Sequence, residues 1–342
     1  MPTFSKKLET LDLVGGGGGM AACIRRLARF GIGVTISSSL NVANQFMGWL
    51  QSLARVSELV SVWKGLLLRI AKHWIAGENY EDALKRAEQS NAQKIQGIVN
   101  LLGEDITARE DTSAATQEYL EILKTITARK VQSCISIKPT QLGLGIDTTF
   151  FEENLSTVVS TASSLSNFVW MDMEGSRYTT ETVESYLELV RKFDNVGLAI
   201  QAYLKRSEED VNRILDLRGK IRLCKGAYNE SPEIVFRKKD EINRNYSKLM
   251  RLIFERGQGF AIATHDEKLI QEAITLSNVH HADFEFEMLM GIRDKKKLEL
   301  AQRGYRVSEY IPFGKRWWAY STRRISEHKS NIFLLARSLM SG

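Results

Sequence analysis

Short apolar runs rich in β-favouring residues alternate with longer segments of helical periodicity from about residue 80 onward. Charged and apolar residues recur at helical spacing from Tyr80 to Gln96, where the first run begins. Strands that alternate with helices pair in parallel, and eight such units over roughly 250 residues favour closure into a barrel over an open sheet. The pattern therefore predicts an α/β fold, a (β/α)8 TIM-like barrel. Its predicted strands are Gln96–Leu101, Cys134–Ile137, Phe168–Met171, Val196–Ile200, Ile221–Cys224, Gly259–Ala263, Phe284–Phe286 and Tyr305–Ile311.

Polar side chains stand at or just after the end of every predicted strand. In a (β/α)8 barrel these ends converge on one face, where the active site is built. A single polar residue there indicates only that the chain reaches solvent, but eight in succession favour a common pocket. They are Glu104, Lys138, Asp172, Gln201, Lys225, Thr264 with His265, Glu287 and Tyr310.

The segment before the barrel differs in character. The run Gly15–Gly19 is a flexible break, and the pattern predicts a partly helical N-terminal appendage over residues 1–65, with the barrel over 66–342. The stretch Val56–Ala76 is amphipathic, but its charged residues deny it the ~20 uninterrupted apolar residues of a membrane span. It suits a helix that lies on a bilayer or on the domain. Because a secretory signal pattern is absent, we expect a cytoplasmic protein, with peripheral contact at the inner membrane face as the alternative.

Composition narrows the functional classes. The formal net charge is +6, but Lys and Arg are interleaved with Asp and Glu, so no stripe predicts nucleic-acid binding. Three cysteines and five histidines show neither a disulfide framework nor the spacing of metal ligands. The sequence therefore predicts neither nucleic acid nor a metal ion as a partner.

Several strand-end motifs together resemble the proline dehydrogenase family. Ile221–Tyr228 reads Ile-Arg-Leu-Cys-Lys-Gly-Ala-Tyr. The resemblance runs in the expected order over about residues 66–330. Its other motifs are Ser136–Gly143, Gln201–Leu204, Ala263–Asp266, Phe284–Arg293, Tyr310–Gly314 and Tyr320–Glu327.

The resemblance implies a flavoprotein that holds FAD at the C-terminal face of a distorted barrel. Hydride would pass from C5 of L-proline to flavin N5 and give Δ1-pyrroline-5-carboxylate, the first step of proline catabolism to glutamate. A Rossmann fingerprint is absent, so FAD is inferred through the resemblance alone. Glu287 stands where the family commonly has glutamine. The implied cofactor residues are Gln201, Arg222, Lys225, Gly226, Ala227, Thr264, His265, Asp266 and Glu287.

For the substrate carboxylate, the resemblance implies a clamp made by Arg323 and Arg324. Tyr320 precedes them by three and four residues, so it shares a helix face with each. An isolated Arg-Arg pair is usually a solvated helix surface, but the surrounding motifs favour the clamp. Glu327 can pair with Arg323 at helical spacing, and in the family the gating arginine also meets a glutamate after the first strand, here Glu104.

The resemblance also completes the substrate pocket and the catalytic set. Asp172 and Lys138 can form a buried ion pair whose loss would leave an uncompensated charge. We expect Lys138 with the two clamp arginines to lower the pKa of the bound amine, so that solvent can take its proton. The catalytic set is Lys138, Asp172, Arg222 and Tyr228, and the substrate set is Lys138, Asp172, Leu223, Tyr228, Tyr310, Tyr320, Arg323 and Arg324.

Two other functions are alternatives to proline oxidation. A barrel lyase or aldolase would use Lys138 or Lys225 as a Schiff-base nucleophile. A membrane-surface binding protein would use the Val56–Ala76 helix, but that leaves the eight strand ends unexplained. Family membership implies a quinone or another electron acceptor, and functional coupling to a pyrroline-5-carboxylate dehydrogenase.

Overall fold

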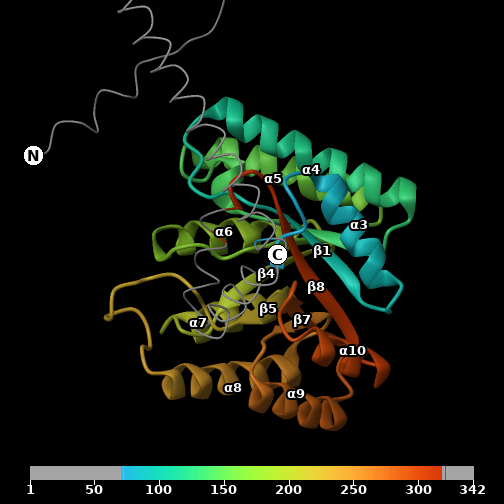
Figure 1. Ribbon diagram of the computed structural model, residues 1–342. Coiled ribbons are helices and arrows are strands. Elements are labelled where there is room, and N and C mark those ends of the chain that lie inside the picture. The colour runs from blue at the N-terminus through green and yellow to red at the C-terminus, as the bar shows by residue number, and fades with distance from the viewer. Residues whose placement is uncertain (1–70, 72, 318–319, 321–342) are drawn as a thin grey trace, which may run out of the picture. The chain divides into compact units, whose positions relative to one another are not determined.

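A computed structural model of the chain describes residues 71, 73–317 and 320. Within them, eight parallel strands close into a barrel in chain order, with β8 paired to β1 (Figure 1). The predicted barrel is confirmed, whereas the predicted appendage over residues 1–65 lies outside the described residues. The strands are β1 Gln96–Leu101, β2 Ser133–Ile137, β3 Val169–Met171, β4 Val196–Gln201, β5 Lys220–Cys224, β6 Phe260–Ala263, β7 Phe284–Leu289 and β8 Arg306–Phe313.

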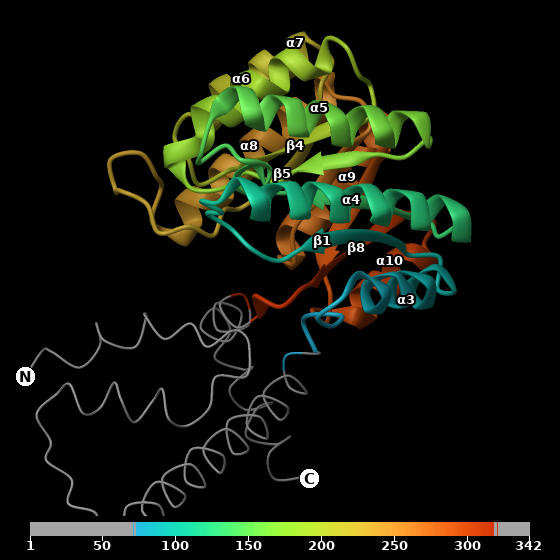
Figure 2. The same ribbon diagram turned by 90° about the horizontal axis from the view of Figure 1, so that it is seen from above.

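Helices surround the barrel and connect successive strands. The first of them precedes β1 and packs against both β1 and β8, where the ring closes. Figures 1 and 2 show α4 and α5 running side by side over the first strands. Within the described part of the chain, none of the helices combines the length and apolar character needed to cross a bilayer. The helices are α3 Tyr80–Asn91, α4 Arg109–Arg129, α5 Thr148–Ser164, α6 Thr179–Val190, α7 Ser207–Asp216, α8 Lys239–Arg256, α9 Glu267–His280 and α10 Asp294–Gln302, with short 3₁₀ turns η4 Pro139–Leu142 and η5 Ser176–Tyr178.

Side-chain caps fix where several helices begin. Asn79, Asp147 and Asp266 stand directly before α3, α5 and α9, and the side chain of each accepts a hydrogen bond from a backbone N–H of the first helical turn. These N–H groups have no partner inside the helix, so the cap satisfies a donor that would otherwise depend on water. Asp266 thereby sets the start of α9 at the face where the strands end.

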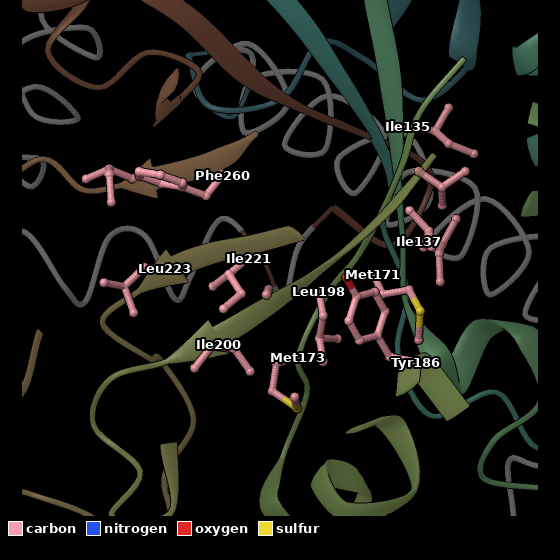
Figure 3. Close-up of a cluster of buried hydrophobic side chains, with 14 of the residues drawn as sticks. Ile135, Ile137, Met171, Met173, Tyr186, Leu198, Ile200, Ile221, Leu223 and Phe260 are labelled. Carbon is pink, nitrogen blue, oxygen red and sulfur yellow. The ribbon is translucent and has the colours of Figure 1, made fainter. Parts of the chain in front are cut away.

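The main hydrophobic core lies between the strands and the helices. Alternate residues of a strand point to the same side, so Ile135 and Ile137 of β2 and Leu198 and Ile200 of β4 all face outward into this layer (Figure 3). Tyr186 of α6 packs among them from the helix side. Full burial of each such apolar side chain contributes about 1.5–3 kcal/mol to stability.

The remaining alternate residues point into the barrel, whose interior holds both apolar and polar side chains. Ile98, Trp170 and Ala261 pack together there, and the Ser308 hydroxyl of β8 donates to Glu285 of β7 at 2.6 Å. Trp170 requires glycine on the next strand, because a Cβ at Gly197 would lie 2.3 Å from the indole ring. Towards the carboxyl ends of the strands, inward polar residues line the cavity at the face where the strands end.

Three predicted strand ends fall short of the observed ones. β4 continues to Gln201, β7 to Leu289 and β8 to Phe313. Gln201 and Glu287 therefore belong to their strands, and Tyr310 lies further from the end of its strand than predicted. Their side chains line the cavity from inside the barrel, and a polar residue inside a strand is easily taken for the end of an apolar run.

A buried ion cluster on the outside of the barrel joins β8 to two helices. Glu309 of β8 accepts hydrogen bonds from Nε and Nη2 of Arg86 at 2.7 and 2.8 Å and from the Ser90 hydroxyl at 2.9 Å. Lys297 of α10 donates to the other side of the same carboxylate. The cluster joins α10 to the next strand and α3 to a strand 223 positions later in the sequence.

Candidate active site

A cavity of about 760 Å³ opens at the end of the barrel where the strands terminate. Residues from all eight strands, or from the segments directly after them, contribute to its wall. The structure thus brings together most of the residues that the sequence singled out. Those that line the cavity are Glu104, Lys138, Asp172, Gln201, Arg222, Lys225, Gly226, Ala227, Tyr228, Thr264, His265, Asp266, Glu287, Tyr310 and Tyr320.

Asp172, directly after β3, is the hub of the site. Its Oδ1 accepts hydrogen bonds from the Ser136 hydroxyl at 2.7 Å and from Arg222 Nη1 at 2.9 Å. Its Oδ2 accepts from Lys138 Nζ at 3.0 Å and from the Tyr310 hydroxyl at 2.6 Å. Four donors from three other strands therefore converge on a single buried carboxylate.

The electrostatics keep this hub ionised. Burial by itself would raise the pKa of Asp172, but Lys138 and Arg222, with the hydrogen bonds from Tyr310 and Ser136, outweigh burial and lower it. Burial would likewise lower the pKa of Lys138, yet the Asp172 carboxylate, joined by other anionic groups, raises it well above its ordinary value. The site therefore holds a carboxylate and an ammonium group in direct contact.

Arg222 is held between two carboxylates and two aromatic rings. Its Nε lies 2.5 Å from Glu287 Oε2, and its guanidinium carbon lies 4.6 Å from the Trp170 ring centroid and 5.6 Å from that of Tyr310. Burial raises the pKa of Glu287 to about 8 in spite of Arg222, and the neighbouring Glu285 adds to the rise.

We expect Glu287→Gln to make the free energy of unfolding less dependent on pH. The pKa of this carboxyl rises from an ordinary 4.5 to about 8 on folding, so between these values the folded chain binds more protons than the unfolded chain. The contribution is complete below the lower pKa and is lost as the pH rises through the higher one, by roughly 1.4 kcal/mol per unit of pKa difference. Urea unfolding across this pH range measures the slope. Glu255→Gln, at an exposed helix position, should keep the wild-type slope, and an equally steep slope in Glu287→Gln would contradict the assignment.

Unsatisfied polar atoms in the cavity wall indicate what kind of ligand fits. Arg222 Nη2, Glu287 Oε1 and Asn100 Oδ1 are buried and have no hydrogen-bond partner among the residues that the structure describes. Buried polar groups normally have partners, so these atoms suit a ligand with both donors and acceptors on its edge. Lys239 and Arg316 add positive charge to the wall, which suits an anionic group on the same ligand.

The loop after β5 provides a close backbone approach to this cavity. Gly226 has φ +107°, and a Cβ there would lie 2.1 Å from the Tyr203 ring, so only glycine fits this position. Lys225, just before it, pairs with Asp266 at 2.8 Å. His265 Nε2 accepts a hydrogen bond from the Leu289 backbone N–H at 3.0 Å, which fixes the imidazole against β7.

One predicted substrate residue lies elsewhere. Leu223 is fully buried in the layer between strands and helices, beside Ile221 (Figure 3), and it does not line the cavity. Arg222 and Cys224 on the same strand do line it, so strand alternation turns Leu223 outward. The structure therefore does not bring the Leu223 side chain to the candidate cavity. The predicted clamp residues Arg323 and Arg324, with Glu327, lie outside the described residues.

The sequence analysis did not identify several residues of the site. Asn100 and Ser136 lie inside strands, and Asn100 Nδ2 donates to the Ser136 carbonyl at 2.9 Å. Trp170, whose ring contacts Arg222, lies within a predicted strand but was not assigned to the site. The sequence pattern could have indicated Asn100 and Ser136. Each is a polar residue within an otherwise apolar strand, and each lies two or four positions from another residue that points into the barrel.

Comparisons of the sequence with known proteins all indicate the same family. A family model described as proline dehydrogenase matches residues 83–336. Proline dehydrogenase 2 of Bacillus subtilis (strain 168) is 33% identical over 280 residues, which cover 78% of this chain and 92% of that protein. Proline dehydrogenase of Deinococcus radiodurans is 31% identical over 281 residues, which cover 80% and 91% of the two chains.

A solved structure supports the same fold. Proline utilization A from Bdellovibrio bacteriovorus, inactivated by N-propargylglycine, matches with a TM-score of 0.72 at 22% identity over 78% of this chain. This chain spans 33% of that longer protein, and at such identity the likeness concerns the fold alone. The family match over most of the barrel and the two relatives above 30% identity lead to one conclusion: this chain belongs to the proline dehydrogenase family, oxidoreductases that act on proline.

Proposed function

We propose that the chain uses FAD to oxidise L-proline to Δ1-pyrroline-5-carboxylate, the first step of proline catabolism to glutamate. When bound, FAD would accept at N5 the hydride that leaves proline C5. The observation that carries the proposal is the position of Arg222, a buried cation with an unsatisfied Nη2 in the cavity wall. A fixed positive charge beside a flavin stabilises its reduced, anionic form.

The chain's own residues would bind and orient the two ligands. Arg222 and Glu287 would meet the flavin ring, while Lys225 and the backbone at Gly226 would meet the phosphates. The remaining polar residues of the predicted cofactor set line the same cavity, which supports the proposal. They are Gln201, Thr264, His265 and Asp266.

On the substrate side, the hub would hold proline against the ring. Tyr310 and Tyr228 would offer apolar ring faces to the pyrrolidine, and Asp172 fixes Tyr310 through its hydroxyl. Lys138 would lower the pKa of the bound amine, so that its proton can leave to solvent. The carboxylate clamp by Arg323 and Arg324 remains a prediction.

One experiment tests the proposal directly. The purified protein should be yellow, and anaerobic addition of L-proline should bleach the flavin absorbance, whereas glycine in place of L-proline should not. Readmission of a soluble quinone should restore the colour. A colourless protein, or a yellow one that L-proline does not bleach, would refute the proposed reaction.

The Schiff-base alternative fits the site poorly. A nucleophilic lysine needs an unprotonated amine, usually through a lowered pKa. The pKa of Lys138 is instead raised well above its ordinary value, and Lys225 is paired with Asp266. We therefore expect no adduct at either lysine after borohydride treatment with a carbonyl compound.

Two further partners belong to the proposal. We propose a quinone as the electron acceptor, with peripheral membrane contact as the means of reaching it. Because the proposed product is what a pyrroline-5-carboxylate dehydrogenase consumes, we also propose functional coupling to such an enzyme. Both rest on the family resemblance.

A further inference from the structure

The segment between β5 and α8, residues 225–238, forms a strap at the mouth of the cavity. Figure 2 shows it as the ochre loop that stands out from the barrel. Its first residues, Lys225 to Tyr228, line the cavity, whereas its tip around Glu233 is exposed to solvent. The strap therefore carries cavity residues on a segment that contains neither a helix nor a strand.

Both ends of the strap are fastened to the loop after β4. At one end, Tyr203 N donates to the Lys225 carbonyl at 2.9 Å, and at the other, Phe236 N donates to the Tyr203 carbonyl at 2.8 Å. Leu204 and Val235 form an antiparallel bridge and pack together. The two ends are thus fixed, and the position of the middle depends on other contacts.

In the middle, Glu230 reaches across to the loop after β3. Its Oε1 accepts a hydrogen bond from the Ser176 backbone N–H at 2.6 Å, and its Oε2 accepts from the Ser176 hydroxyl. Ser176 begins the η5 turn, and both residues are partly buried. Two donors on one carboxylate form a charge-assisted bidentate contact, the stronger class of protein hydrogen bond.

Glu230 stands two residues after Tyr228, whose hydroxyl donates to Glu104 Oε1 at 3.1 Å. Tyr228 and Glu104 line the main cavity and also a smaller one of about 300 Å³, which Ser176 and Glu230 line as well. The Tyr228 side chain is therefore part of the wall between two cavities. Its place in that wall depends on the strap that carries it.

We propose that Glu230 is a positioning residue that acts through Tyr228. By binding Ser176, it divides the unanchored middle of the strap into shorter spans, which lowers the conformational freedom of each. Tyr228 is then held against the cavity before any ligand enters. Without Glu230, the strap would leave the wall, and the main cavity would open sideways into the smaller one.

Hydrogen exchange of the purified flavoprotein tests this anchor in the absence of substrate. Glu230→Gln keeps the shape of the side chain but removes its charge and one of its two acceptor oxygens. We expect the Ser176 amide and the strap amides near Tyr228 to exchange about ten- to a hundredfold faster, the range for losing a hydrogen bond to a charged group. Glu233→Gln, an exposed carboxylate on the same strap, is the matched control and should exchange like the wild type.

Kinetics then test the positioning role, and this step rests on the proposed function. Glu230→Gln should raise KM for L-proline about tenfold while kcat changes little, because the hub around Asp172 is untouched. Ser176→Ala, which keeps the backbone donor and loses the hydroxyl, should fall between wild type and Glu230→Gln. The melting temperature should stay close to that of the wild type.

These experiments test the role of Glu230 and the proposed oxidation of proline separately. Equal exchange in Glu230→Gln and Glu233→Gln would overturn the anchor, and faster exchange with an unchanged KM would overturn the positioning role. A wild-type protein whose flavin L-proline does not bleach would refute the proposed reaction, while the exchange rates would still decide whether Glu230 holds the strap.

Discussion

Replacing Asp172 with alanine is expected to lower kcat/KM for L-proline by about a hundredfold or more and to destabilise the fold by about 3–5 kcal/mol. The reason is that this one carboxylate contacts two buried cations. Lys138 and Arg222 contact it at 3.0 and 2.9 Å, so its loss leaves two buried charges with much less compensation. Steady-state kinetics and urea unfolding measure the two effects.

Matched variants separate charge from shape at this position. Asp172→Asn keeps the size of the side chain, so it should pack better than alanine but still fail to neutralise Lys138. Asp194→Ala removes an exposed carboxylate and should leave both measurements near the wild type. If Asp172→Ala were as active and as stable as Asp194→Ala, the role of the hub would be disproved.

Replacing Glu309 with alanine is expected to cost about 3–5 kcal/mol of stability while the remaining folded enzyme stays active. The variant removes the buried carboxylate that Arg86 and the buried Lys297 ammonium share, and leaves Lys297 only the exposed Asp294 as an acidic partner among the described residues. Burial would raise the pKa of Glu309, but the hydrogen bond from Arg86 and the charge of Lys297 outweigh burial and lower it below 4.5. The wild-type contribution is therefore present above pH 4.5 and is lost as the pH falls through the lower, folded-state pKa.

Urea unfolding at neutral and at acid pH tests this expectation. The difference between wild type and Glu309→Ala should be largest at neutral pH and should shrink in acid. Glu299→Ala serves as the control, because Glu299 pairs with Lys296 on the exposed side of α10, where an ion pair contributes about 0–1 kcal/mol. A Glu309→Ala variant no less stable than this control would show that the cluster does not hold α3 and α10 in place.

The order and number of strands could be predicted from the sequence because each strand buries an apolar outer face. The predicted ends were too early at β4, β7 and β8, where a polar inward residue stands near the end of the strand. Glu287, for example, was placed after its strand, although the strand runs on to Leu289. Apolar runs in the sequence identify the residues that pack between the strands and the helices. They do not predict which side chains fill the interior of the barrel.

Most residues of the site could be predicted from the sequence, but the contacts between them could not. Family motifs pointed to Lys138, Asp172 and Arg222, and all three meet. No local pattern could show that Ser136 also binds Asp172, because this contact depends on the register of β2 against β3, in which Ser136 lies opposite Trp170. Leu223 was misplaced for a related reason: a motif names consecutive residues, whereas a strand sends them to opposite faces.

The closure of the barrel by α3 bears on how the chain folds as it is synthesised. Arg86 and Glu309 are separated by 223 positions, and α3 packs against β1 and β8. A ribosome releases α3 and β1 long before β8, so the part of the helix that packs on β8 stays uncovered until most of the domain has been made. A chaperone that shields this helix would favour the yield of folded protein, and a circular permutant that starts at β1 and appends α3 after β8 would remove the delay.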